Sequence, residues 1–428
     1  MKIISINNDD LLFPWKLYIC YFCACFLIFL FGPWKYSNIN FPILFVFLTL
    51  YLLISSIAYN HGINKAKTHA PFKKDIPIIL LKIIIIASLI VLSFMLLFKI
   101  QDYGMFSMSN IFHNMALAYS NTRNSSTDVV DKAMQLFNKV GFIIYISQIL
   151  GYYYFKSIDK KYQILIIFES CLIFIFTMCY LGQQKVIGDF TVIYISVFMA
   201  KMYKKINSSK LSKKILFILL IILIVILFAS ILSSRLEMMK MSVGNLGSNL
   251  YYLDTSFFLF KIFPYQFALG LVEFMFYCSH GFYGLSLCLN EPFVWTHGLG
   301  GFPVIDTLLN IDSSKILTYP VRVAEKTSWS AKSVWHTIFP WLASDFTFLG
   351  SIIIISICAY IYAISWYEIV NNEKWQSILM FSMLNIIWVY SIANNQLFMS
   401  KATFALFFVV SILWLLRNKK VIVRKRKV

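Results

Sequence analysis

The chain has 428 residues, of which 59% are hydrophobic and only 13% charged, with a mean hydropathy of +0.73. This composition excludes a soluble globular domain, in which about 25% of residues are charged. A net charge of +19 would suggest nucleic acid in a soluble protein, but here the basic residues lie mainly between hydrophobic runs. They are better explained as determinants of membrane orientation, and no nucleic-acid partner is expected.

The hydrophobic runs are continuous and have the length that a helix needs to cross roughly 30 Å of hydrocarbon. We therefore expect an all-α polytopic membrane protein with about 10–12 transmembrane helices. The N-terminal membrane region, 1–232, has seven predicted spans, at 17–32, 41–59, 76–98, 140–155, 163–181, 186–200 and 215–232. A long loop follows over 233–346, and residues 347–428 hold three more spans, at 347–366, 376–392 and 401–416, and a basic tail.

Most of the 38 Lys and Arg residues lie in the segments 61–75, 156–161 and 201–214 and in the tail from 417 to 427. Basic loops remain in the cytoplasm, so we expect a multi-pass membrane protein with both termini cytoplasmic. The long loop 233–346 then faces the outer side of the membrane. Residues 256–289 are apolar enough to enter the bilayer, as two short spans, a re-entrant hairpin or surface helices.

Three arginines, Arg123, Arg235 and Arg322, fall on the predicted outer side, and every other Arg lies in the tail. The planar guanidinium binds phosphate through two parallel hydrogen bonds, which Lys cannot do. These residues are candidates for binding a phosphorylated substrate. The alternative for each is an ion pair or an anchor at the membrane interface.

Other candidates carry alternative interpretations as well. Lys185 and Asp189 share a helix face at the start of the sixth span, so they pair or Lys185 points toward a ligand. His297 and His336 have the chemistry of a general base, and Asp345 could orient an acceptor hydroxyl or cap the eighth span. Glu169 lies inside the fifth span, where we favour a structural hydrogen bond.

Aromatic side chains gather near Gly-rich turns in the long loop, namely Tyr283, Trp295 and Trp335. Such side chains offer flat surfaces with a polar group, which suit sugars and membrane interfaces. The sequence has no zinc-protease motif, P-loop or dinucleotide fingerprint, so neither a metal nor a cofactor is expected.

Three segments of the long loop resemble the Wzy family of O-antigen and oligosaccharide repeat-unit polymerases. They are Gly-Phe-Tyr-Gly-Leu-Ser at 281–286, Trp-Thr-His-Gly-Leu-Gly-Gly at 295–301, and Trp-x-Thr with Asp-Phe-x-x-x-Gly between 335 and 350. The arrangement of spans with a long late outer loop is similar too. The Gly-x-x-Lys turn at Gly182 resembles a family position that often carries Arg, and here the residue is Lys185.

The resemblance implies a metal-independent glycosyltransferase with a GT-C-like membrane fold, acting in lipopolysaccharide biosynthesis in the bacterial inner (cytoplasmic) membrane, with the long loop in the periplasm. Its donor would be a glycan on undecaprenyl pyrophosphate, transferred to a new lipid-linked repeat unit at the periplasmic face, and the family implies a chain-length regulator as partner. Arg235, Arg322, His336 and Asp345 would be catalytic, and substrate would contact Arg123, Lys185, His297, Trp295, Trp335 and Tyr283. The alternatives are an O-antigen ligase of the same fold and, less favoured, a polysaccharide transporter or flippase.

Overall fold

The computed structural model describes residues 8–68, 75–103, 132–181, 184–203, 211–238, 247–309, 311, 315–330, 334–372 and 374–418. Arg123 lies outside these residues. The first half consists of the elements α1 (Asn8–Phe31), β1 (Trp34–Tyr36), α2 (Phe41–Lys67), α3 (Ile78–Tyr103), α5 (Lys132–Val140), α6 (Phe142–Tyr153), η1 (Phe155–Ser157), α7 (Lys160–Ile175), the π-helix η2 (Phe176–Leu181), α8 (Gln184–Tyr203) and α9 (Leu211–Met238).

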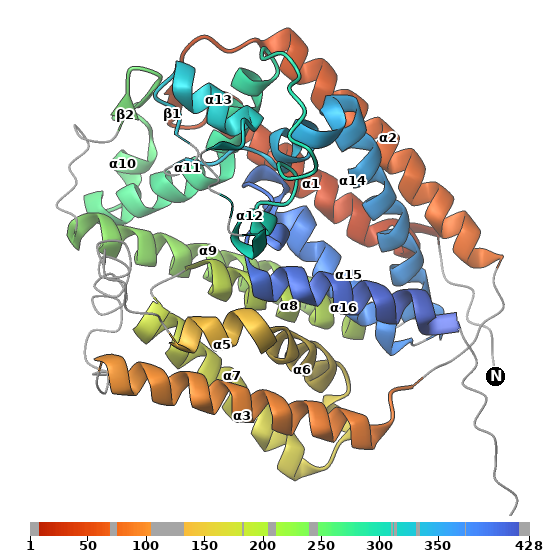
Figure 1. The fold of residues 1–428 in the computed structure, drawn as a ribbon. Helices are drawn as coiled ribbons and strands as arrows, with labels where there is room; N and C mark the ends of the chain where they lie inside the picture. Colours follow the sequence, from red (N-terminus) through yellow and green to blue (C-terminus); the bar gives the residue numbers. More distant parts are fainter. Residues whose placement is uncertain are drawn as a thin grey trace, which may run out of the picture.

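The second half begins with small elements, β2 (Gly247–Ser248), β3 (Tyr251–Leu253), α10 (Leu259–Ile262), α11 (Tyr265–Cys288), α12 (Val304–Leu309) and α13 (Tyr319–Lys326). It ends with α14 (Ile338–Asn372), α15 (Trp375–Val389), the short 3₁₀ helices η6 (Tyr390–Ile392) and η7 (Gln396–Phe398), α16 (Lys401–Leu415) and η8 (Leu416–Asn418). Long helices make up the body of the molecule, and the small elements β1 to β3, α10 and α13 gather at one end, at the top of Figure 1.

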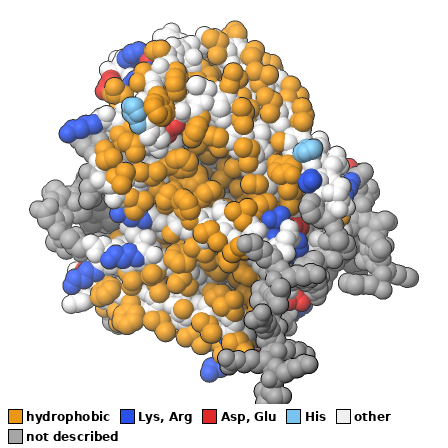
Figure 2. All heavy atoms as spheres, turned by 45° about the vertical axis from the view of Figure 1, so that its right-hand side comes forward, with side chains coloured by type: hydrophobic (Ala, Val, Ile, Leu, Met, Phe, Trp, Pro, Cys, Tyr) orange, Lys and Arg blue, Asp and Glu red, His pale blue; other side chains and the backbone are white. Residues whose placement is uncertain are grey.

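Eight of the described helices are long and apolar enough to cross a membrane, and the bent pair α5 and α6 would make a ninth. The eight are α1, α2, α3, α7, α8, α14, α15 and α16. Hydrophobic side chains cover most of the face in Figure 2. The exposed large apolar residues include Phe45 and Ile57 of α2 and Ile353 of α14. Apolar side chains this exposed on long helices are stable against lipid, so the chain is an all-α multi-pass membrane protein whose partner is the lipid bilayer.

The helices differ in places from the predicted spans. The fourth span, expected over 140–155, is a bent pair, because α5 and α6 meet at 59° around Gly141. Helix α2 continues to Lys67 and α14 begins at Ile338, so both are longer than the apolar runs predicted. The seventh expected span lies in α9, where the side chains of 211–218 and 220 are outside the description.

The apolar stretch 256–289, whose structure the sequence left open, forms the short helix α10 and the single 24-residue helix α11. Helix α11 packs along α9 and α1 and is not among the eight candidate spans. Strand β1, in the connector after α1, pairs antiparallel with β3, with Trp34 opposite Leu253. The Trp34 indole also donates a hydrogen bond to the Val272 carbonyl (2.9 Å), which fixes the first connector against α11.

Hydrogen bonds and ion pairs between helix ends define two groups of ends. One group holds the ends assigned to the cytoplasm: Tyr203 donates to Asp10 (2.8 Å), the Trp366 indole donates to the Asp10 carbonyl (3.2 Å), and Lys82 pairs with Asp159 (2.6 Å). We call this the basic end. The other group, which we call the cap end, holds residues 33–40, the start of α8, the described residues between 247 and 337, and the connector 390–398.

Candidate functional site

The connector 390–398, between α15 and α16, links the separate parts of the cap end. A Cβ added at Gly188 of α8 would lie 2.1 Å from the Tyr390 hydroxyl oxygen, and one added at Gly281 of α11 would lie 1.9 Å from the Ile392 carbonyl oxygen. Farther along, Phe398 packs edge-on against Phe302, with 4.9 Å between ring centroids. The connector therefore brings α8, α11 and the long loop to one place.

Two asparagines fasten this connector. Asn394 has a positive φ of 58°, and its side-chain Oδ1 accepts from the His336 backbone N–H (2.9 Å) and from the Trp341 indole (3.0 Å). The Asn395 amide donates to the Gly301 carbonyl (2.7 Å). Sequence reasoning did not select these residues, although two adjacent amides between apolar helices were a usable signal.

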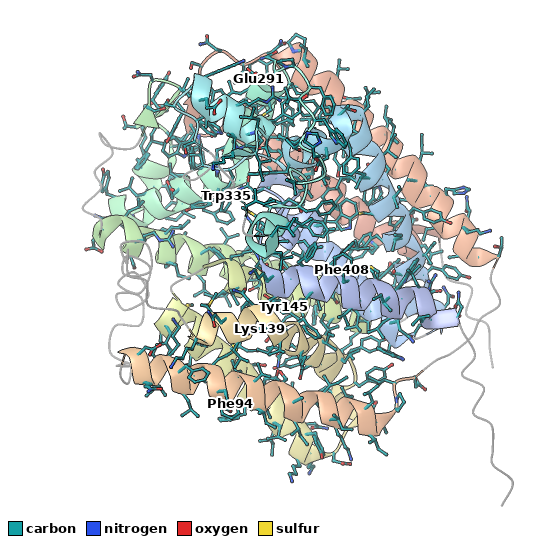
Figure 3. The ribbon with its side chains drawn as sticks, viewed as in Figure 1. Phe94, Lys139, Tyr145, Glu291, Trp335 and Phe408 are labelled. Carbon is teal, nitrogen blue, oxygen red and sulfur yellow. The ribbon has the colours of Figure 1, made fainter. Side chains whose placement is uncertain are left out.

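A buried group of side chains, which we call the histidine cluster, lies beside the connector and consists of His280, Tyr283, Trp329, Trp335 and His336. The His280 ring lies 5.3 Å from the Trp335 ring and 6.1 Å from the Trp329 ring. Gly284 of α11 permits this packing, since a Cβ there would meet Trp329 Nε1 at 2.8 Å and His336 Cδ2 at 2.9 Å. Figure 3 labels Trp335 within this part of the molecule.

Several polar atoms of the histidine cluster are buried without a hydrogen-bond partner in the described structure. They are both ring nitrogens of His336, the Trp329 Nε1 and the Tyr283 hydroxyl. Native proteins rarely leave such atoms unpaired, and each unpaired atom marks a place for a water molecule or a ligand group. The histidine cluster is thus the most concentrated set of available donors and acceptors that we find at the cap end.

Both histidines of the cluster are held neutral. Burial lowers the pKa of His336 to about 3, with a further contribution from His280. Burial also lowers the pKa of His280 to about 4, although its contact with the Phe276 carbonyl opposes the shift. A neutral imidazole can accept a proton, but so low a pKa gives a weak base until the site opens to water or substrate.

Arg322 lies in an ion pair, which is the alternative to substrate binding that the sequence left open. Its guanidinium is largely buried, donates to the Pro292 carbonyl (2.8 Å) and the Leu317 carbonyl (3.2 Å), and lies over the Tyr319 ring. Glu291 lies 3.8 Å away and also pairs with Lys326 (2.6 Å). Arg322 therefore clamps α13 to the segment after α11; Figure 3 labels Glu291.

The carboxylate oxygens of Asp345 are likewise taken up by hydrogen bonds within the cap. Its Oδ1 accepts from the Thr296 hydroxyl (2.5 Å) and the Gly298 N–H (2.8 Å), and its Oδ2 accepts from the Gly301 N–H (2.6 Å). Because α14 begins at Ile338, Asp345 lies inside that helix and not at its N-cap. The carboxylate fixes the Gly-rich turn 296–301 against α14.

Trp295 and His297 extend from that turn. Trp295 is 57% exposed and its ring centroid lies 4.5 Å from that of His297, which is exposed and has a positive φ of 56°. The Asp345 hydrogen bonds to Thr296 and Gly298 fix the backbone on either side of His297. The pair is therefore an exposed aromatic surface on a rigid turn.

Two cations lie at the cap ends of α8 and α9. Lys185 pairs with the buried carboxylate of Asp189 (3.3 Å), which also accepts from the Tyr145 hydroxyl (3.1 Å). Arg235 lies near Glu273 of α11, which is half-buried; burial raises the pKa of that carboxyl to about 7, and Arg235 opposes the rise. Each cation therefore has an acid beside it.

A small apolar cluster joins α8, α9 and η2 near the cap end. It contains Ile231 of α9, packed with Met178 and Ile187. Ile187 lies two residues after Lys185, so these two side chains lie on opposite faces of α8, and Ile231 lies one turn before Arg235.

The two outer arginines are not brought together. Arg235 is beside Glu273, whereas Arg322 acts on Cys288 and Glu291 at the far end of α11. Fifteen residues of helix separate Glu273 from Cys288, which is about 22 Å along the axis. The histidine cluster lies between these positions, at Gly281 and Gly284.

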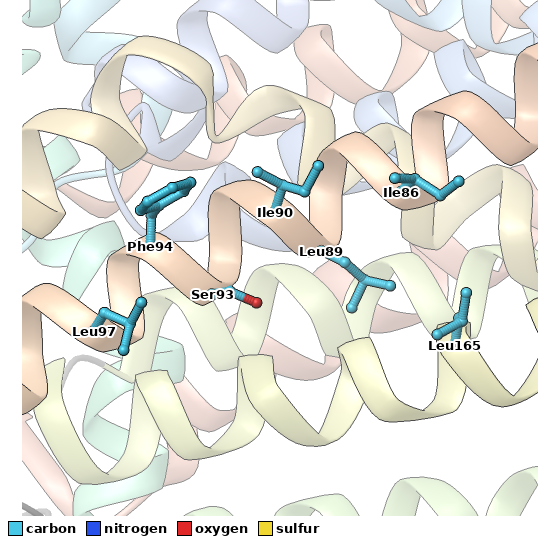
Figure 4. Close-up of a pocket in the computed structure, with 7 residues that line it drawn as sticks. All are labelled: Ile86, Leu89, Ile90, Ser93, Phe94, Leu97 and Leu165. Atoms are coloured by element: carbon cyan, nitrogen blue, oxygen red, sulfur yellow. The ribbon is translucent and has the colours of Figure 1, made fainter.

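A pocket lies elsewhere, on the surface of α3. It has a volume of about 390 Å³ and is formed by one side of α3, including Ile90 and Phe94, with Leu165 of α7 (Figure 4). Its lining is apolar apart from Ser93, and Ile90 and Phe94 are more than half exposed. This position on a candidate span fits acyl chains of the bilayer.

These features define the class as a polytopic helical membrane protein with a compact polar cap. Comparisons with protein-family models, with curated proteins and with solved structures find no match for this chain.

Proposed function

We propose that this protein is a glycosyltransferase of the O-antigen polymerase type, acting on lipid-linked pyrophosphate substrates at the cap end. The observation that carries the proposal is the position of two cations at the cap end, Lys185 at the start of α8 and Arg235 in the last turn of α9. A lipid diphosphate has its charge at the membrane surface, where these helices end. Cations held in place before the reaction stabilise the charge that develops on the leaving group.

In the proposed reaction, the bond between the anomeric carbon of the growing glycan and the pyrophosphate oxygen breaks. A hydroxyl of the new repeat unit forms the new bond to that carbon, and undecaprenyl pyrophosphate leaves with the bonding electrons. The acceptor proton moves to a neutral base, for which His336 is our candidate. Trp295 and His297 would offer a surface for the sugar units.

In this proposal, Arg322 and Asp345 hold the cap in place and do not bind the pyrophosphate. Their hydrogen bonds go to the segments 291–292 and 296–301, so they act as positioning residues for the cap. We therefore assign the pyrophosphate to Lys185 and Arg235.

The test is polymerisation by the full-length protein in lipid vesicles, with lipid-linked repeat units as substrate. We expect Arg235→Ala and Lys185→Ala to lower the rate by about 100-fold, the typical effect of removing one charge-stabilising group. Lys326→Ala is the matched control, because that cation is 60% exposed and lies away from α8 and α9. Normal rates and chain lengths in both variants would contradict the assignment.

The ligase alternative predicts a different product. A deletion strain that adds a single repeat unit to the lipopolysaccharide core lacks a polymerase. One that adds none, while lipid-linked polymer accumulates, lacks a ligase. The second outcome would show that the protein is a ligase and not a polymerase. Lys185 and Arg235 would keep their proposed role, because both reactions release the same lipid pyrophosphate.

A further inference from the structure

A carboxyl group lies in the membrane domain, away from the proposed glycosyl-transfer site. Glu169 is completely buried in α7, within the candidate span Lys160–Tyr180. Its Oε2 accepts from the Ser147 hydroxyl of α6 (2.8 Å), and its Oε1 accepts from the Ser88 hydroxyl of α3. Among the described residues, neither Lys nor Arg forms an ion pair with it.

A second set of hydrogen bonds lies beside this carboxyl. The Gln148 Oε1 accepts from the hydroxyls of Ser170 and Tyr194, both at 2.8 Å, and the Ser170 and Tyr152 hydroxyls are 2.8 Å apart. Gln148 follows Ser147 and Ser170 follows Glu169, so both sets lie between α6 and α7. The Gln148 Nε2 is buried and has no hydrogen-bond partner in the described structure.

The hydrogen-bonded side chains of Gln148, Ser170, Tyr152 and Tyr194, which we call the polar set, continue toward the basic end. The ammonium group of Lys201, near the end of α8, donates to the carbonyl of Tyr152. Tyr145, Gln148 and Tyr152 are spaced by three and four residues, which places them on one face of α6. That face forms a line of polar groups inside the bundle.

The helices that carry these groups are irregular. Helix α6 has 12 residues, about 18 Å of helix, which is too short to cross the bilayer, and it meets α5 at 59°. Helix α7 continues into the π-helix η2. Broken helices and π-helical turns in membrane proteins are frequent at sites that bind ions or substrates.

A proton suits the Glu169 site better than a metal ion does. The Ser147 and Ser88 oxygens are hydrogen-bonded directly to the carboxyl oxygens, so the four oxygens do not surround a common cation. A serine hydroxyl can donate or accept, so it satisfies the carboxylate and the carboxylic acid alike. Protonation removes a charge that is costly at membrane depth.

The charged neighbours on the packed helices have other partners. On α3, Lys82 lies about 9 Å along the axis from Ser88 and pairs with Asp159. On α8, Asp189 pairs with Lys185. Tyr194 of α8 is a titratable side chain near Glu169, and it belongs to the second set of hydrogen bonds through Gln148.

We propose that Glu169 is a reversible proton-binding site in the membrane domain, exchanging with water at the basic end through Gln148, Ser170 and Tyr152. This goes beyond the proposed glycosyl transfer, which needs no proton at this position.

The test is infrared difference spectroscopy of the full-length protein in lipid vesicles. We expect the wild type at pH 7 to show the carbonyl stretch of a protonated carboxyl group that is absent in Glu169→Gln, and we expect this band to weaken as the pH rises to about 9. Identical wild-type and Glu169→Gln spectra would overturn the proposal, as would a band that never changes with pH.

A hydrophobic carbodiimide gives an independent measurement with a control inside the same protein. The O–H of a protonated carboxyl adds across a carbodiimide C=N bond, and the adduct rearranges to a stable N-acylurea. Glu368 is also buried, but its oxygens accept hydrogen bonds from Arg417 (2.8 Å) and Lys374 (3.0 Å). We expect the label on Glu169 and little on Glu368, and the reverse pattern would overturn the proposal.

Polymerisation by Glu169→Gln separates the two proposals. Retained polymerisation together with a lost carbonyl band supports the proton site whether or not Lys185 and Arg235 bind pyrophosphate.

Discussion

Burial decides the chemistry of His336, whose side chain has no exposed surface and whose ring nitrogens have no hydrogen-bond partner in the described structure. An imidazolium would lose its hydration there without gaining a hydrogen bond to replace it, so the neutral ring is favoured. His280 shares this environment, and each histidine further disfavours a charge on the other. The same environment that makes His336 available as a proton acceptor also makes it a source of pH sensitivity.

The unfolded chain protonates histidine near pH 6.5, whereas in the fold His336 has a pKa of about 3. The unfolded state therefore binds more protons between these values, so stability is full above pH 6.5 and decreases as the pH falls. We expect the unfolding temperature of the purified protein to fall from pH 7 to about pH 5, and to fall less steeply in His336→Gln. The quantity to compare is the slope of the unfolding temperature against pH, because the variant also changes packing and so shifts the unfolding temperature at every pH.

His297→Gln is the control, because that side chain is exposed and should leave the slope unchanged. Equal slopes in wild type and His336→Gln would show that His336 is accessible to protons in the folded state.

At the scale of elements, the break in α14 shapes the cap. Thr347 has a φ of 62° inside the helix, so the segment from Ile338 to Phe346 turns away from the long span that follows. This segment presents Asp345 to the turn 296–301, and the Ser344 hydroxyl accepts from the Tyr319 N–H (3.0 Å). The sequence indicated only the start of a span here. In the structure, the segment from Ile338 to Phe346 anchors two parts of the long loop, the turn 296–301 and the start of α13.

Asp345→Asn should loosen the turn 296–301. An amide has one oxygen in place of two, and its NH₂ group would face a backbone N–H. We expect a loss of about 1–3 kcal/mol, the cost of leaving a buried donor unsatisfied. Hydrogen exchange of Gly298 and Gly301 should become faster.

Asp254→Asn is the matched control, since Asp254 also accepts a backbone N–H, from Ser256 (3.0 Å), but in an exposed turn. Unchanged exchange in Asp345→Asn would mean that the turn is held by other contacts.

At the scale of the whole molecule, the helix ends form two faces, and a buried ion cluster joins three helices at the basic end. Glu368 of α14 is hydrogen-bonded to Lys374 (3.0 Å) before α15 and to the Arg417 Nε (2.8 Å) after α16, and the Ser377 hydroxyl also donates to it. The Arg417 guanidinium lies over the Trp414 ring at 3.4 Å. The last three spans are therefore fastened to one another next to the basic tail.

Glu368→Gln should lower the unfolding free energy by about 3–5 kcal/mol, because it leaves two buried cations without their counter-charge. The unfolding temperature in detergent micelles measures this. Asp9→Asn is the control, since its pair with Lys16 is exposed (2.7 Å) and such pairs contribute little. Similar unfolding temperatures for the two variants would contradict a structural role for the cluster.

The sequence by itself determined the membrane class and the approximate positions of the spans, because continuous apolar runs are local properties that hydrocarbon selects directly. The orientation that the charge bias predicts, with both termini in the cytoplasm, stays a prediction. Glu169 was expected to form a structural hydrogen bond, and it accepts from Ser88 and Ser147.

Only the tertiary structure decided which polar groups meet. The sequence placed Arg235 and Arg322 in one loop, yet α11 separates them, and Arg322 is occupied by the carbonyls of Pro292 and Leu317. The connector 390–398 was missed because its contacts join residues far apart in the chain, as when Asn395 binds the Gly301 carbonyl. Such contacts depend on helix packing and close glycine approaches, which local patterns do not encode.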